Sequence, residues 1–162
     1  MIEAVQPLDA GKLRIVNIRL TKCAFELNPQ ASLSSEAELQ VELEISITRT
    51  FPSETLGIAR LELGVFTKSP SAPFRVVVQH EGHFEVADGH VQMLQEYMRF
   101  NAIATLVPYC RESISSLSVR AGFPPLVLPP LNVKQLVDQE EVARAKQQEI
   151  DRQPILGAPQ SQ

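Results

Sequence analysis

Apolar and polar side chains alternate with a period of two along residues 37–49, AELQVELEISITR. The apolar positions are all odd-numbered: Leu39, Val41, Leu43, Ile45 and Ile47. The positions between them carry three glutamates and other polar residues. This period predicts a β-strand with one apolar and one solvated face.

Three further segments complete a predicted sheet. Residues 12–27 are strand-like, but the parity of their apolar positions changes twice, which predicts either β-bulges or a strand that changes partner surfaces. Residues 57–66 and 73–87 supply two more strands, and turn residues such as Pro52 and Pro70 separate the segments. Four successive strands with short connections indicate an antiparallel sheet.

The period changes to three and four residues between about 92 and 121, which predicts a long helix that ends before Gly122. One apolar face of this helix contains Leu106, Cys110, Ile114, Leu117 and Ala121. Pro108 lies within it, and we expect this residue either to kink the helix or to begin a new segment near Val107.

Residues 123–133 combine four prolines with large apolar side chains. Proline donates no backbone hydrogen bond, so this crossover segment is expected to be extended. Its apolar side chains require cover, either from the domain itself or from a partner. Residues 133–150 then predict a largely polar C-terminal helix, with Glu140 and Arg144 four residues apart.

Strands followed by helices predict an α+β fold: a four-stranded antiparallel sheet, a long helix, the crossover segment and a C-terminal helix. We expect a single domain at residues 1–152 and a disordered tail at 153–162.

The composition fits a cytoplasmic protein with its own core. The chain has 162 residues, 44% of them hydrophobic, and a net charge of -4 without a basic stripe. It therefore shows no feature of nucleic-acid or membrane binding. Its two cysteines are typical of a reducing compartment. The N-terminus lacks the pattern of a signal peptide, and no apolar run is long enough to span a membrane.

Two groups of residues invite a chemical interpretation. His80, His83 and His90 are the three histidines, but His80 and His83 would point to opposite faces of a strand, which disfavours a metal site. Cys110 lies on the apolar helix face and is expected in the core. Nucleotide-binding, hydrolase and zinc-binding motifs are missing, so we predict neither an enzyme nor a cofactor.

The helix also carries the serines Ser113, Ser115, Ser116 and Ser118. They are interpreted either as polar surface or as small residues that let another helix approach closely.

The stretch LVPYCRESISSLSVRAGFPPLVLPPLNV, residues 106–133, resembles the signature region of the SecB protein-export chaperone family. The matching positions are Pro108, Tyr109, Arg111, Glu112, Phe123, Pro124, Leu126, Leu128, Pro130 and Asn132. The order of predicted elements matches too, and the resemblance covers roughly residues 12–150.

The resemblance implies an ATP-independent holdase that assembles as a homotetramer, a dimer of dimers. Family members bind unfolded or precursor polypeptides in apolar grooves and deliver them to the SecA motor. On this sequence the implied groove residues are Leu39, Val41, Leu43, Phe123, Leu126, Leu128 and Leu131.

The implied SecA-docking positions depart from the family's acidic pattern. Glu26 keeps one carboxylate, whereas Cys23 replaces a usual aspartate and Val77 a usual glutamate. Arg75 adds a positive charge. Because each change weakens attraction to a basic partner, a chaperone dedicated to one partner, such as the antitoxin of a toxin–antitoxin system, is the alternative hypothesis. A third hypothesis is a small-ligand binder or enzyme that uses His80, His83 or Cys110.

Overall fold

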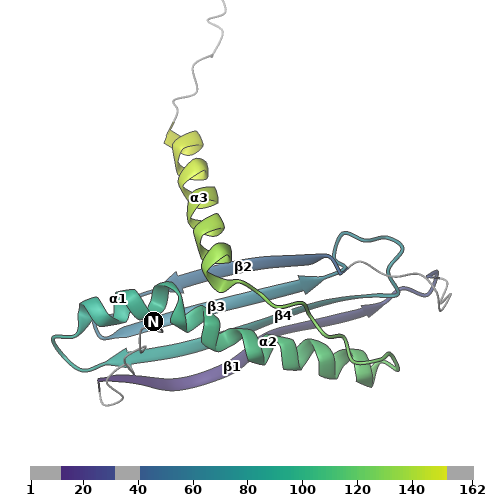
Figure 1. The fold of residues 1–162 in the computed structure, drawn as a ribbon, viewed down its shortest axis with the longest axis horizontal. Coiled ribbons are helices and arrows are strands. Elements are labelled where there is room, and N and C mark those ends of the chain that lie inside the picture. The colour runs from purple at the N-terminus through teal and green to yellow at the C-terminus, as the bar shows by residue number, and fades with distance from the viewer. Residues whose placement is uncertain (1–11, 32–40, 153–162) are drawn as a thin grey trace, which may run out of the picture. The chain divides into compact units, whose positions relative to one another are not determined.

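The computed structural model describes residues 12–31 and 41–152. Strands β1 (Leu13–Leu27), β2 (Leu43–Thr50), β3 (Leu56–Val65) and β4 (Phe74–Val86) form an antiparallel sheet in the order β1-β4-β3-β2 (Figure 1). Three helices follow: α1 (Val91–Arg99), α2 (Asn101–Arg120) and α3 (Val133–Arg152). The predicted α+β fold class is confirmed.

The strand with the clearest alternation is shorter than its pattern. β2 begins at Leu43, and Val41 precedes it without belonging to a strand. Leu39 lies outside the described residues. An alternating segment forms a strand only where it has a pairing partner. The pairing of β2 with β3 ends where Leu43 faces Val65, so the residues before Leu43 are not part of the strand.

The two bulges predicted in β1 are confirmed, between Ile15 and Asn17 and between Leu20 and Lys22. They explain why the parity of the apolar residues changes along this strand. With both register shifts, seven apolar residues of β1 pair with even-numbered residues of β4, from Val86 to Phe74: Leu13, Ile15, Ile18, Leu20, Cys23, Phe25 and Leu27. Each bulge therefore returns the apolar side chains of β1 to one face of the sheet.

The predicted long helix is two helices, because α1 ends at Arg99 and α2 begins at Asn101. The break lies at Phe100, and α2 continues through Pro108. Proline in a helix leaves the carbonyl four residues earlier without its donor. Ala104 and Pro108 are both exposed, so water can hydrate that carbonyl.

Helices α1 and α2 cover one face of the sheet and contact β3 and β4 (Figure 1). The even-numbered residues of β4 are buried under them, including Val76, Val78 and Phe84. Gly82 permits the close approach, since a Cβ atom there would lie 2.8 Å from the Phe84 ring and 3.1 Å from Leu106. We call this the helix face and the opposite side the open face.

The chain divides into two compact units between Pro130 and Leu131. The second contains α3, which is capped by Asn132: its Oδ1 accepts from the Gln135 amide at 3.1 Å. The predicted pairing of Arg144 with Glu140 is present at 2.8 Å. A single domain over 1–152 stays a prediction, and the predicted tail lies outside the described residues. None of the described helices is long and apolar enough to cross a membrane.

Candidate functional site

The crossover segment leaves α2 through a tight C-terminal cap. Gly122 adopts a positive φ of 87° and donates its amide to the carbonyl of Val119 at 3.0 Å. The Phe123 amide donates to the carbonyl of Ser118, also at 3.0 Å. This pair of bonds is a Schellman motif, which reverses the chain so that residues 123–130 run back along α2 (Figure 1).

Two side chains of α2 then hold the returning segment. The Leu126 amide donates to Ser118 Oγ at 2.9 Å, while that hydroxyl donates to the carbonyl of Ser115 at 2.8 Å. Farther along, Arg111 Nη2 donates to the carbonyl of Leu128 and, at 3.2 Å, to that of Pro129. The sequence offered two interpretations of Ser118, as polar surface or as a small residue at a helix contact. In the structure it is buried and anchors the crossover segment instead.

Phe123 fixes the start of the segment to the sheet. Its ring centroid lies 4.9 Å from that of Phe74. Phe74 also stacks on Phe25 of β1 at 5.0 Å and contacts Phe66 edge-on at 5.5 Å. Such offset and edge-on pairs stabilise aromatic clusters beyond the burial of area alone.

The predicted groove residues come from several elements of the chain. Phe123 and Leu126 are partly buried in the crossover segment, and Leu128 is buried, with 2% of its surface exposed. Val41 and Leu43 are partly buried at the start of β2. Leu131 belongs to the second unit. Leu39 lies outside the described residues.

Sequence reasoning missed the most exposed large apolar residue of the segment. Val127 is 77% exposed, whereas its neighbour Leu128 is 2% exposed. In an extended chain successive side chains point to opposite sides. The signal was therefore available: if Leu128 faces the domain, Val127 faces away from it.

The open face of the sheet carries charges that pair with one another. Arg14 contacts Glu85, and Lys22 Nζ lies 3.0 Å from Glu62 Oε2. Lys68 contacts Glu44. Each of these carboxylates is thus paired with a cation of the same chain, which comes from a neighbouring strand or loop.

Glu81 is the centre of this face and is buried despite its charge. Arg19 Nη2 lies 2.6 Å from its Oε1, Arg60 Nε 2.5 Å from its Oε2, and His83 Nε2 2.7 Å from its Oε1. Burial alone would raise the pKa of Glu81, but the hydrogen bonds from His83, Arg19 and Arg60 outweigh it and lower the pKa to about 2.

Three of the four predicted docking positions share the open face. Arg75 pairs in register with Glu26, and Val77 with Ala24. Cys23 pairs instead with the buried Val78 and therefore lies on the helix side of β1. The three open-face positions carry one negative charge, one positive charge and an apolar side chain.

His80, His83 and Cys110 lie on the faces that the sequence predicts, although both histidines are inside β4 rather than at its end. His80 belongs to the helix face and His83 to the open face, and Cys110 is fully buried. Cys110 Sγ lies 3.5 Å from His80 Nδ1, and Ser113 Oγ lies 3.4 Å from His80 Nε2. Burial lowers the pKa of His80 and raises the pKa of the Cys110 thiol to about 12. A neutral thiol is a poor nucleophile, and the described residues hold no cluster of metal ligands.

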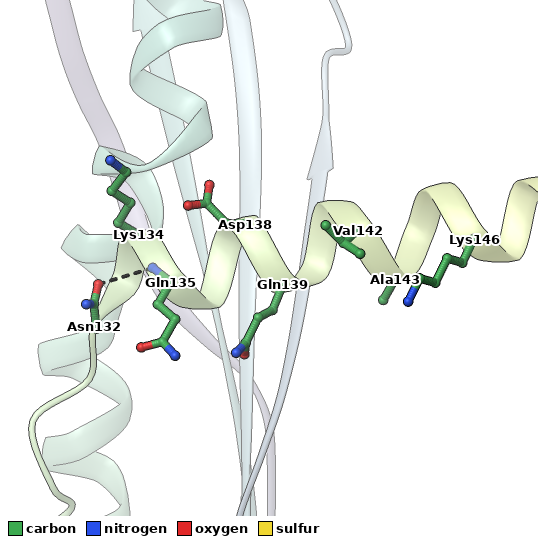
Figure 2. Close-up of a pocket in the computed structure, with 8 residues that line it drawn as sticks. All are labelled: Asn132, Lys134, Gln135, Asp138, Gln139, Val142, Ala143 and Lys146. Carbon is green, nitrogen blue, oxygen red and sulfur yellow. Dashed lines mark hydrogen bonds between the residues drawn. The ribbon is translucent and has the colours of Figure 1, made fainter.

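The second unit has a shallow hollow along α3 (Figure 2). Val142 and Ala143 form its apolar part among longer polar side chains. The lining residues are Asn132, Lys134, Gln135, Asp138, Gln139, Val142, Ala143 and Lys146. Val142 is 54% exposed, so this helix presents a small apolar strip on a polar surface.

The chain as a whole is similar to known proteins. The model of a family described as preprotein translocase subunit SecB matches residues 9–144. The chain belongs to the SecB family. This assignment confirms the resemblance found in the sequence and supports a chaperone role for the chain.

Relatives of this SecB-family chain extend over most of its length. The protein-export protein SecB of Azoarcus sp. (strain BH72) is 35% identical over 121 residues, 75% of this chain and 70% of that protein. The SecB of Saccharophagus degradans is 31% identical over 115 residues, 71% and 68% of the two chains. An uncharacterized protein of Methanocaldococcus jannaschii is 27% identical over 123 residues, 75% and 79%.

A solved structure shares the SecB-like fold. It is a SecB-like chaperone of Mycobacterium tuberculosis in complex with a ChAD peptide from the HigA1 antitoxin. The TM-score is 0.60 at 20% identity, with 76% of this chain and 93% of that chain covered.

Proposed function

We propose that this SecB-family chaperone is an ATP-independent holdase of the cytoplasm that binds unfolded or precursor polypeptides. The crossover segment carries the proposal, because it is extended, anchored at both ends and displays Val127 at 77% exposure. A non-native chain has no fixed surface to recognise. An extended apolar surface can bind many such chains through burial of apolar side chains and many weak contacts.

We further propose that the holdase is a homotetramer in which edge strand β1 is covered by a second copy. Within the described residues, β1 pairs on one side only, with β4. Its apolar helix-side residues remain accessible: Ile15 is 45%, Leu20 48% and Leu27 59% exposed. A long apolar edge strand invites pairing with another chain, and oligomerisation is a common way to cover it.

After a polypeptide is bound, its delivery to SecA is the first candidate for the next step, in keeping with the protein-export relatives. A chaperone dedicated to one partner is the second, and the open face favours it. A docking face for a basic partner needs free carboxylates. Here Glu44, Glu62 and Glu81 are already paired with cations of the same chain. The fold relative bound to an antitoxin peptide agrees with this second candidate.

The holdase proposal is tested by light scattering. A urea-denatured polypeptide is diluted into buffer with or without the protein, and we expect the protein to suppress aggregation at equimolar amounts without nucleotide. Unchanged scattering for several denatured polypeptides would refute the proposal. Calorimetric titration with purified SecA separates the two candidates, because export predicts binding and a dedicated chaperone predicts none.

A further inference from the structure

We propose that Ser118 and Arg111 are positioning residues that set the register of the crossover segment, so that Val127 rather than Leu128 faces a bound polypeptide. This inference rests on the proposed holdase function and specifies how its binding surface is presented. It assigns a role to two α2 residues that do not themselves lie on the exposed side of the segment.

The prolines restrict which residues can be anchored. Residues 124–130 read PPLVLPP, so only Leu126, Val127 and Leu128 have an amide hydrogen to donate. Ser118 Oγ accepts from the first of these, at 2.9 Å. Its own hydrogen is directed to the carbonyl of Ser115, which leaves the oxygen lone pairs for the segment.

Arg111 fixes the other end by binding carbonyls rather than amides. Its guanidinium donates to the carbonyls of Leu128 and Pro129. Proline lacks an amide hydrogen but keeps its carbonyl, so this end of the segment can still accept hydrogen bonds. Arg111 and Ser118 are seven residues apart on α2, or about 10 Å along a helix. Three extended residues span roughly the same distance, so the spacing of the two anchors on α2 matches the length of residues 126–129.

Register decides which side chain is displayed. With Leu126 on Ser118, Leu128 is buried at 2% exposure and Val127 is 77% exposed. A slip of one residue would place Val127 on Ser118 and exchange the two sides, because extended side chains alternate. The anchors thus determine the apolar residue that a client polypeptide meets.

A double-mutant cycle tests this inference. The dissociation constant for a fluorescently labelled unfolded polypeptide is measured for Val127→Asn, Ser118→Ala and the double variant. We expect Val127→Asn to weaken binding by about fivefold, and Ser118→Ala by a similar factor, which corresponds to about 1 kcal/mol each. Once Ser118 is removed, Val127→Asn should have little additional effect. Ser118→Thr keeps the hydroxyl and should restore tight binding, and Ser116→Ala on the same helix is the matched control.

Arg111→Met gives an independent arm in case Ser118→Ala misfolds. Arg120→Met, an exposed residue of the same helix, is its control. We expect coupling with Val127→Asn for Arg111 and none for Arg120. Strictly additive effects of Val127→Asn with both anchor variants would overturn the inference while leaving the holdase proposal intact. A wild-type protein that binds no unfolded polypeptide would instead refute the holdase proposal, and the inference with it.

Discussion

Among single residues, Glu81 shows how the open face is stabilised. Its carboxylate is buried and contacts cations from β1 and β3 as well as His83 from its own strand. A buried charge is costly unless it is well paired, and removing one partner leaves the others uncompensated. The alternation of β4 predicts that Glu81 and His83 share a face. It does not predict the pairing with Arg19 or Arg60, which depends on strand order and register.

We expect Glu81→Gln to lower the free energy of unfolding by roughly 3 kcal/mol, because two arginines lose a shared carboxylate. In the wild type, the folded-state pKa of about 2 lies below the ordinary value of 4.5. The contribution of Glu81 to stability is therefore present above about pH 4.5 and is lost as the pH falls toward 2. Urea unfolding across this range should show a steeper acid loss for the wild type than for the variant.

Glu85→Gln is the matched control, since Glu85 pairs with Arg14 on the exposed part of the same face. Exposed pairs contribute about 0–1 kcal/mol. Equal destabilisation by the two substitutions would contradict a special role for Glu81.

Among the elements, strands were predicted more reliably than helices. The parity changes in residues 12–27 offered bulges or a change of partner surface, and the structure has two bulges, which return apolar side chains to one face of the sheet. The break at Phe100 could not be predicted, since neither proline nor glycine marks it and Pro108 is tolerated inside α2. The anchoring role of Ser118 was also hidden, because its partner lies eight residues away in a segment without periodic structure.

Strand β1 is where an element-level change should affect assembly. Leu20→Glu places a charge on its exposed apolar side, and we expect the assembly to shift toward smaller species because a like charge from each copy would meet there. Size-exclusion chromatography with light scattering measures this change. Val142→Glu, at a similarly exposed valine of α3, should leave the mass unaltered. An unchanged mass for Leu20→Glu would exclude this side of β1 from the interface.

Helix α3 is largely polar and belongs to a compact unit of its own. We therefore expect deletion of residues 134–162 to leave the assembly intact and to change the affinity for unfolded polypeptides. Analytical ultracentrifugation and fluorescence anisotropy measure the two properties. Loss of the assembly on deletion would show that α3 has a structural role.

For the whole molecule, family membership carries a chaperone role, and several carboxylates of the open face are paired with cations of the same chain. The predicted docking positions Glu26 and Arg75 oppose each other in register, which places a positively charged residue beside the one carboxylate among these positions. We propose that clients bind instead to the apolar crossover segment, which Ser118 and Arg111 hold on α2.

Native mass spectrometry tests the central claim most directly. The purified protein is measured alone, after addition of a precursor polypeptide diluted from urea, and after addition of the same polypeptide in its folded form. The account predicts a homotetramer that gains the mass of the unfolded chain and ignores the folded one. A protein that takes up neither form, at concentrations where the tetramer is intact, would contradict the holdase account.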